Sequence, residues 1–340
     1  MTRAIGLDRD APLGKQGTRK FARVISRTGE KPIDPNRPRH SLLPMTRRPD
    51  QPVIEDATRR PALWRLAVGF ITAFAVLALW VAALIGLRAI VLGTGFVDAA
   101  ADLLALGANT PQAAILTLLA VAGLGVGASA AAYLWHRRTP RSLIGPGPRT
   151  LRQGSIAAAT ALMFLGCLAA LALPFSDPVS LNMSPAIWLA WLPLGLAALI
   201  LQTGGEEILF RGYLQSQLAA RFDSRLIPIL IPSILFGLAH YVPGFPPAAA
   251  LTYVLIATLF GILAADLTSR TGSIGAAWGF HLANNALAVL IVAPAGSITG
   301  LALWQSGIEF GPEALTSPLA TLEVLVLLAT WLLIRRVLRV

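Results

Sequence analysis

Long apolar segments separated by short polar loops make up the chain from residue 61 onward. Eight such segments lie near 65–88, 112–135, 154–174, 186–205, 226–241, 248–267, 274–294 and 319–338. A helix that spans a bilayer needs about 20 predominantly apolar residues, and most of these segments reach that length. The pattern predicts an all-α fold, a polytopic membrane bundle of about eight transmembrane helices.

Residues 1–60 follow a different pattern, rich in Pro, Arg, Asp and Ser and without a sustained apolar run. They carry 14 Lys and Arg against 7 Asp and Glu, which is half of the 28 basic residues of the chain. This composition predicts a disordered basic tail, 1–60, ahead of a transmembrane domain, 61–340. The tail has no interleaved aromatic residues and no nucleic-acid motif, so we expect it to lie near anionic lipid headgroups and to bind no nucleic acid.

The charges of the loops predict the orientation in the membrane. Basic residues mark the loops at 136–152, 221–225 and 270 and the C-terminus, whereas the loops near 175–185, 242–247 and 295–318 contain no Lys or Arg. Because cytoplasmic loops carry the excess of Lys and Arg, both termini are predicted to be cytoplasmic. The Ala- and Arg-rich composition is typical of a bacterial protein, which predicts the inner (plasma) membrane as its location.

Ionisable side chains inside membrane segments are costly and are default candidates for function. In this chain they gather in three stretches, each on a separate apolar segment. The stretches are GGEEILFRGY (204–213), FGLAH (236–240) and HLANN (281–285). The glycine pair that opens the first stretch indicates either a weak point in the helix or a close approach by a substrate backbone.

Helical spacing gives the first stretch a chemical meaning. Glu207 and Arg211 are four residues apart, so they share a face and can form an ion pair. Glu206 lies about 100° round the helix from Glu207 and can point elsewhere, toward a cavity. A carboxylate and an imidazole together can position and deprotonate a water molecule.

The other two stretches supply the remaining parts of a peptide hydrolase. His281 and Asn285 are four residues apart and can converge on one oxygen, where they can donate hydrogen bonds to a developing oxyanion. Phe236 lies one turn before His240 and can wall its ring. A water molecule would then be the nucleophile, without a covalent intermediate.

The depth of these residues constrains the helix that carries the first stretch. If that helix ended at residue 205, Glu206 would lie at the inner surface, far from His240. If it continues to about residue 220, Glu206 lies about 22 Å above its end, and His240 lies about 21 Å above residue 226, at about 1.5 Å per residue. We therefore predict one helix over 186–220, tilted or bent near Pro193.

The order EExxxR, FxxxH and HxxxN on separate membrane helices resembles the CAAX-protease and bacteriocin-processing family (CPBP, or Abi). Its Rce1-like members are regarded as glutamic intramembrane proteases. The resemblance covers about 150–295, which would be the protease-like core. It implies a general base, Glu206, with His240 as its partner on the water, and an oxyanion site formed by His281 and Asn285.

The same resemblance implies that Glu207 and Arg211 support the first motif and that the protein is an intramembrane endopeptidase. The substrate is then a peptide or protein segment near the membrane, cut by a glutamic or a metallo-type mechanism. Two His and one Glu match a catalytic zinc, but the helical signal HExxH is absent, so we expect no metal or other cofactor.

Other classes of function remain as hypotheses. A non-proteolytic binding or bacteriocin-immunity protein on the same scaffold is the main alternative. A transporter or proton relay is a third, because Glu and His in membrane helices also serve that purpose. A monomer and a homodimer are both compatible with the sequence.

Overall fold

The computed structural model describes residues 52–172, 179–294, 297–307 and 317–340. By its contacts the chain divides into Met1–Leu43 and Pro44–Val340, and the structure below is that of the second unit. Of the predicted tail, residues 1–51 lie outside the described part. Pro52–Ala57 form the helix α2 instead of continuing a disordered tail, because Val53 and Ala57 find buried positions.

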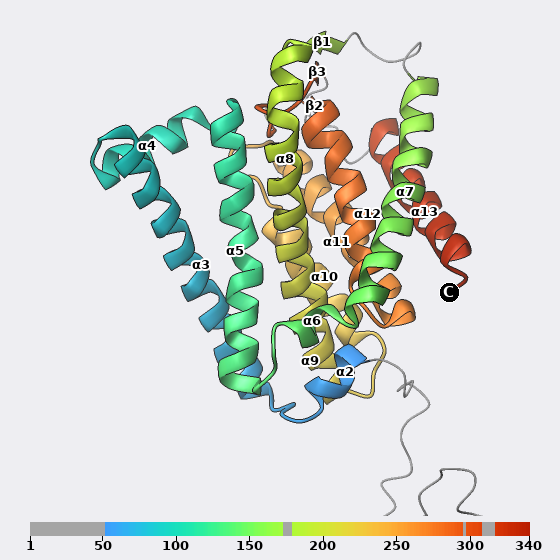
Figure 1. The fold of residues 1–340 in the computed structure, drawn as a ribbon. Coiled ribbons are helices and arrows are strands. Elements are labelled where there is room, and N and C mark those ends of the chain that lie inside the picture. Colours follow the sequence, from blue (N-terminus) through green and yellow to red (C-terminus); the bar gives the residue numbers. More distant parts are fainter. Residues whose placement is uncertain (1–51, 173–178, 295–296, 308–316) are drawn as a thin grey trace, which may run out of the picture. The chain divides into compact units, whose positions relative to one another are not determined.

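Helices account for most of the described residues (Figure 1). The α-helices after α2 are α3 (Leu63–Leu92), α4 (Phe96–Leu106), α5 (Pro111–His136), α6 (Arg141–Ile144), α7 (Gly147–Ala172), α8 (Pro185–Glu207), α9 (Ser216–Arg221), α10 (Ile227–Ala239), α11 (Pro247–Thr271), α12 (Gly275–Ala286) and α13 (Pro318–Leu338). Two π-helices, η2 (Ile208–Gln215) and η3 (Leu287–Ile291), continue α8 and α12.

Three of the long helices begin with the same local signal, a hydroxyl residue followed by proline. Thr110, Ser184 and Ser317 cap α5, α8 and α13, and each hydroxyl accepts a hydrogen bond from a backbone N–H of the first turn. The proline that follows lacks an N–H that the first turn could not satisfy anyway. These helix starts are therefore encoded locally.

The all-α membrane bundle is confirmed, but the count of eight spans is not. Within the described residues, six helices are long and apolar enough to cross a membrane. The predicted fifth and seventh segments are shorter than expected. The α10 helix has 13 residues and covers about 20 Å at about 1.5 Å per residue, against a hydrocarbon core of about 30 Å. The seventh segment consists of α12 and η3, over residues 275–291.

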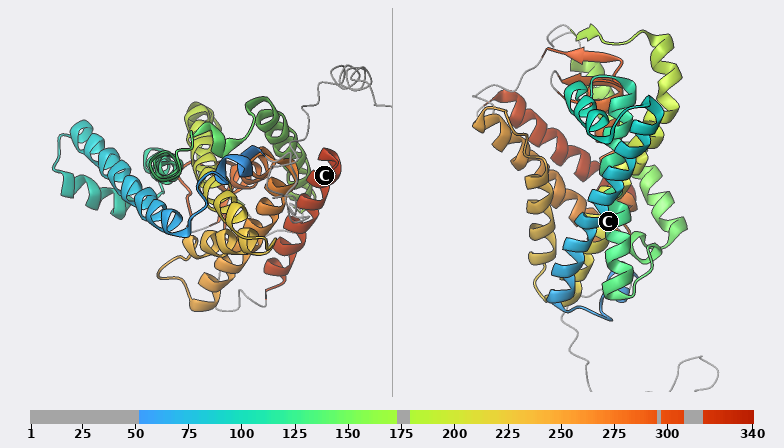
Figure 2. Two further views of the ribbon diagram at one scale, coloured as in Figure 1. Left: turned by 90° about the horizontal axis from the view of Figure 1, so that it is seen from below. Right: turned by 90° about the vertical axis from the view of Figure 1, so that its left-hand side faces the viewer.

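The long helix that carries the first motif lies at the centre of the bundle. Figures 1 and 2 show α8 between α5 and α12, and these helices pack against it. On their other sides, α5 packs against α3 and α12 packs against α7, while α10 packs against α11 and η2. The first motif is thus surrounded by helices that carry the second and the third.

A small sheet, which the sequence did not predict, follows the third motif. Its strands are β1 (Val179–Leu181), β2 (Val292–Pro294) and β3 (Trp304–Ser306), in the order β1-β3-β2. β3 pairs antiparallel with β1 and parallel with β2, which begins directly after η3. Strands of three residues are too short to show an alternating pattern in the sequence.

Candidate active site

The helix of the first motif runs without a break over Pro185–Arg221, which confirms the single long helix that the depth argument predicted. The π-helix η2 begins directly after Glu207, and every side chain from Leu209 to Gln215 is buried. π-Helical turns are rare and occur often at functional sites. Glu206 and Glu207 are 7% and 0% exposed, so both carboxylates lie inside the bundle.

Glu207 is the centre of a buried ionic network. Its Oε1 accepts hydrogen bonds from Nη1 of Arg211 at 2.9 Å and from Nδ1 of His281 at 2.8 Å. Arg211 also donates from Nη2 to the carbonyl of Gly261 in α11, at 3.3 Å. A buried ion pair adds little net stability. The more evident effect of the Glu207–Arg211 pair is geometric, because the same carboxylate oxygen holds the imidazole of His281 in α12.

Glu206 contacts a different set of groups, as about 100° of rotation around the helix requires. Its Oε2 accepts a hydrogen bond from Nε2 of Gln202 at 2.6 Å and lies 3.4 Å from Nε2 of His281. Gln202 in turn accepts from Nδ2 of Asn285 through its Oε1, at 3.4 Å. Gln202 therefore links Glu206 to Asn285 and joins the first motif to the third.

The contacts of His281 define where its proton lies. Because Nδ1 donates to Glu207, a neutral ring presents an unprotonated Nε2 to Glu206. Two acceptors would then face each other at 3.4 Å, which is favourable only if one proton lies on the pair. The contact therefore brings a carboxylate oxygen and an imidazole nitrogen together inside the bundle.

His240 is half-buried at the C-terminal end of α10. Its Nδ1 donates to the backbone carbonyl of Phe236 at 2.8 Å, which leaves Nε2 as the acceptor of a neutral ring. Phe236 walls the imidazole, with 4.5 Å between ring centroids. In the described part of the chain no hydrogen bond or ion pair joins His240 to Glu206. Their convergence on one water molecule stays a prediction.

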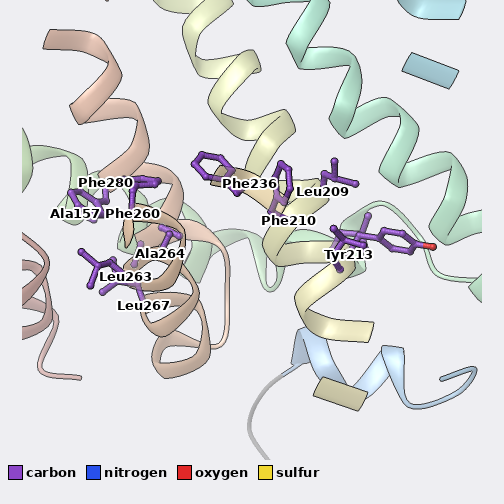
Figure 3. Close-up of a cluster of buried hydrophobic side chains, with 14 of the residues drawn as sticks. Ala157, Leu209, Phe210, Tyr213, Phe236, Phe260, Leu263, Ala264, Leu267 and Phe280 are labelled. Atoms are coloured by element: carbon purple, nitrogen blue, oxygen red, sulfur yellow. The ribbon is translucent and has the colours of Figure 1, made fainter. Parts of the chain in front are cut away.

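Three phenylalanine rings enclose the charged groups of the site. The Arg211 guanidinium lies 4.7 Å from the ring centroid of Phe236, 5.9 Å from that of Phe210 and 6.0 Å from that of Phe260. Phe236 and Phe260 also contact His281, with centroids 5.7 Å and 5.0 Å apart. Figure 3 shows Phe210 and Phe236 side by side. Such an apolar wall strengthens the electrostatic interactions that it encloses.

The glycine pair before Glu206 permits close packing by the helices of the protein itself. A Cβ added to Gly205 would lie 2.7 Å from the carbonyl oxygen of Ala122 in α5. A Cβ added to Gly204 would lie 2.7 Å from the ring of Trp278 in α12. The close approach at these positions is therefore made by α5 and α12, and neither a weak point nor a substrate backbone is needed to explain it.

The structure brings most of the predicted site residues together. Glu206, Glu207, Arg211 and His281 are in direct contact, and Asn285 joins them through Gln202, which sequence reasoning missed. The available signal was its position, one helical turn before Glu206 on the same face of the helix. Among the described residues, no group of three or more His, Cys, Asp or Glu could hold a metal ion.

Comparison with known proteins places the same segment in a family. Residues 187–287 match the Type II CAAX prenyl endopeptidase Rce1-like family. This segment of the chain is therefore similar to that family. A curated relative is the uncharacterized protein YyaK of Bacillus subtilis (strain 168), which is 31% identical over 119 residues. That alignment covers 35% of this chain and 39% of YyaK, so the chain spans well under half the length of this relative.

No solved structure matches the chain. The Rce1-like match includes all three motifs, from Glu206 to Asn285, and confirms the resemblance that they indicated. Six long apolar helices among the described residues, together with the similarity of 187–287 to the Rce1-like family, support an integral membrane protein.

Proposed function

We propose that this protein is an intramembrane endopeptidase that hydrolyses a peptide bond in a membrane-proximal peptide or protein. The observation that carries the proposal is the buried contact between two adjacent glutamates and one histidine: Glu207 holds Nδ1 of His281, and Glu206 faces its Nε2. Carboxylates are costly inside a membrane bundle, and those found there usually have a function. A proton-accepting pair in a water-poor interior is what hydrolysis by an activated water requires.

In the proposed reaction, Glu206 removes a proton from the water that attacks the scissile carbonyl. His240 offers its Nε2 as the second acceptor for that water, because its Nδ1 is held by the backbone. The proton passes to the leaving amine when the tetrahedral intermediate collapses. General acid–base catalysis of this kind contributes about 10²–10⁴-fold to a rate.

His281 and Asn285 are proposed to stabilise the oxyanion of the intermediate. With a proton on Nε2 as well as on Nδ1, His281 can donate a hydrogen bond to that oxygen, and Glu207 stabilises this imidazolium form. The amide of Asn285 provides a second donor. Arg211 pairs with Glu207 at 2.9 Å and holds its carboxylate in place, so Glu207 and Arg211 act by positioning.

The location and the class of substrate are parts of the same proposal. From the loop charges we propose that both termini are cytoplasmic and that the bundle lies in a bacterial inner (plasma) membrane. The name of the matching family refers to prenylated CAAX peptides. Because the composition is bacterial, we propose a membrane-proximal peptide without a prenyl group. All the site residues come from one chain, so the chemistry is possible in a monomer and in a homodimer.

The proposal is tested by comparing the wild type with Glu206→Gln in native membranes. Mass spectrometry of released and retained membrane-proximal peptides identifies fragments that depend on Glu206. A matched control is Glu323→Gln, which removes a carboxylate from another predicted span, Pro318–Leu338, away from the site.

We expect fragments that disappear with Glu206→Gln, persist with Glu323→Gln and survive treatment with a chelator. If these fragments disappear with chelator, the result would contradict the glutamic mechanism and indicate a metal-dependent one. If the wild type and Glu206→Gln gave the same fragments, the proposal of a protease would be overturned and a binding or immunity protein would be favoured.

A further inference from the structure

The residues just before the first span form a strap across one end of the bundle. We define the strap as residues 53–60, which include most of α2. Val53 and Ala57 are buried, and α2 packs against α6 and α9. The strap therefore lies next to the lower end of the long helix that carries Glu206 and Glu207 (Figure 1).

Two buried polar residues, one at the end of α5 and one just beyond it, hold the strap. Arg138 is 2% exposed and donates from Nη2 to the carbonyl of Val53 at 3.0 Å and from Nη1 to Oγ of Ser216 at 2.8 Å. His136 donates from Nδ1 to the carbonyl of Arg60 at 3.0 Å. Its Nε2 accepts a hydrogen bond from the hydroxyl of Tyr213 at 3.1 Å. Both ends of the strap are thus connected to η2 and α9.

Burial lowers the pKa of Arg138 to about 10, so its guanidinium stays charged at neutral pH. A charged donor makes the stronger type of hydrogen bond, about twice as strong as a neutral one. The strap is therefore docked by a specific contact as well as by the burial of two apolar side chains.

A cavity lies behind the strap and reaches the catalytic network. It has a volume of about 30 Å³ and is lined by Val53 and Ile54 of the strap, by Arg211 and Gln215 of η2, and by Thr268 of α11. A buried water molecule needs about 10–15 Å³, so one or two fit. Arg211 is both a wall of this cavity and the partner of Glu207.

Two polar atoms in the lining lack a protein partner. Oε1 of Gln215 and Oγ1 of Thr268 are buried and have no hydrogen-bond partner among the described residues, although Gln215 and Thr268 are only 5% and 6% exposed. An unsatisfied buried polar group costs about 1–3 kcal/mol. Buried water molecules usually satisfy such groups where a polar cavity is large enough.

We propose that this cavity is a water site behind the catalytic network and that the strap closes it. Water held there by Gln215 and Thr268 solvates the Arg211 guanidinium, while the strap keeps bulk water away from the Glu207–Arg211 pair. Release of the strap would weaken that pair by screening and so loosen the orientation of His281. The water site stands without the proposed function, whereas its effect on catalysis rests on that function.

The closure is tested by thiol accessibility, which needs no enzymatic activity. The full-length protein in detergent carries Cys167→Ser and a single reporter, Thr268→Cys, and is labelled with a charged methanethiosulfonate. The strap is released in two ways, by Arg138→Ala, which removes the charged donor, and by Val53→Asp, which places a carboxylate in the buried contact. Ser224→Cys is the exposed control, and Thr330→Cys, fully buried in α13, is the control for general loosening of the fold.

We expect Thr268→Cys to react slowly while the strap is intact and at least about tenfold faster after either release, because each contact removed is worth about a factor of ten. Ser224→Cys should react equally fast, and Thr330→Cys equally slowly, in all backgrounds. Fast labelling of Thr268→Cys with the strap intact, or no acceleration in both release variants, would overturn the closure. A high-resolution structure should show ordered water within hydrogen-bond distance of Gln215 Oε1 and Thr268 Oγ1, and a dry cavity would overturn the water site.

Discussion

Nδ1 of His281 lies 2.8 Å from Oε1 of Glu207, the same oxygen that accepts from Arg211 at 2.9 Å. One oxygen atom thus determines the tautomer of the histidine and holds the neighbouring charge. His281 and Glu207 are 74 residues apart in the sequence, on α12 and at the end of α8. The contact joins the first motif to the third, because Glu207 holds the imidazole of His281.

Replacement of Glu207 by Gln should abolish most of the activity, although Glu207 does not contact the substrate in the proposed reaction. The amide cannot stabilise an imidazolium, so we expect kcat to fall by about 10²-fold or more, with a smaller change in KM. The variant also leaves the buried guanidinium of Arg211 without its paired carboxylate, which should lower the free energy of unfolding by about 3–5 kcal/mol. Steady-state kinetics on a substrate peptide and thermal unfolding in detergent measure the two effects.

The double variant Glu207→Gln, Arg211→Met separates the two effects. Removal of both charges should restore most of the stability, because no unpaired ion remains. Activity should stay low, because His281 still lacks its carboxylate. Recovery of activity together with stability would show that Glu207 has only a structural task.

Gln202 should prove to be a positioning residue that the motifs do not include. Its amide donates to Glu206 and accepts from Asn285, so Gln202→Leu releases two groups at once. A displacement of about 1 Å can cost about 10²-fold in rate, and we expect a loss of that order in kcat with KM nearly unchanged.

Gln217→Leu is a matched control for that substitution. Gln217 lies in α9, is equally buried and has both side-chain polar atoms without a partner among the described residues. Its replacement should leave activity unchanged and should not reduce stability. Equal activity losses in Gln202→Leu and Gln217→Leu would argue that any buried glutamine of this helix matters only for folding.

The sequence carried enough information for the architecture of the site because its residues follow helical spacing. Glu207 and Arg211 could be paired from their separation of four residues, and the depth of Glu206 and His240 required a long fourth helix. Both conclusions depend only on the regular geometry within individual helices, which the sequence pattern indicates.

Other features could not be predicted, because they depend on contacts between distant segments. Arg138 meets Val53 across 85 residues, and Gln202 meets Asn285 across 83. No periodic pattern marks either pair. The count of eight spans is not confirmed, for a related reason: a run of apolar residues does not show where a helix ends, and α10 ends at Ala239, before the histidine.

A methyl group at Gly205 should disturb the packing beside Glu206. The added Cβ would lie 2.7 Å from the Ala122 carbonyl oxygen, so α5 and α8 must move apart. Overpacking of this kind costs about 1–3 kcal/mol, and the shift would carry Glu206 with it. We expect Gly205→Ala to lower both the unfolding temperature and kcat.

Gly166→Ala in α7 is the control, because a Cβ there meets nothing within 4 Å. That substitution should be neutral or stabilising, by up to about 1 kcal/mol from helix propensity. If Gly205→Ala behaved like Gly166→Ala, the close approach of α5 would not be required at this position.

The two histidines of the site should respond differently to replacement by alanine. His281 is buried between two carboxylates, so His281→Ala removes the contacts of both Glu206 and Glu207 with the imidazole and should reduce stability together with activity. His240 is half-buried, and the protein satisfies only its Nδ1, by a bond to its own helix. His240→Ala should therefore cost about 1 kcal/mol of stability and yet lower kcat by about 10²–10⁴-fold. Thermal unfolding measured beside kinetics separates the two cases. A fully active His240→Ala variant would mean that Glu206 and His281 position the water by themselves and that His240 serves only to end α10.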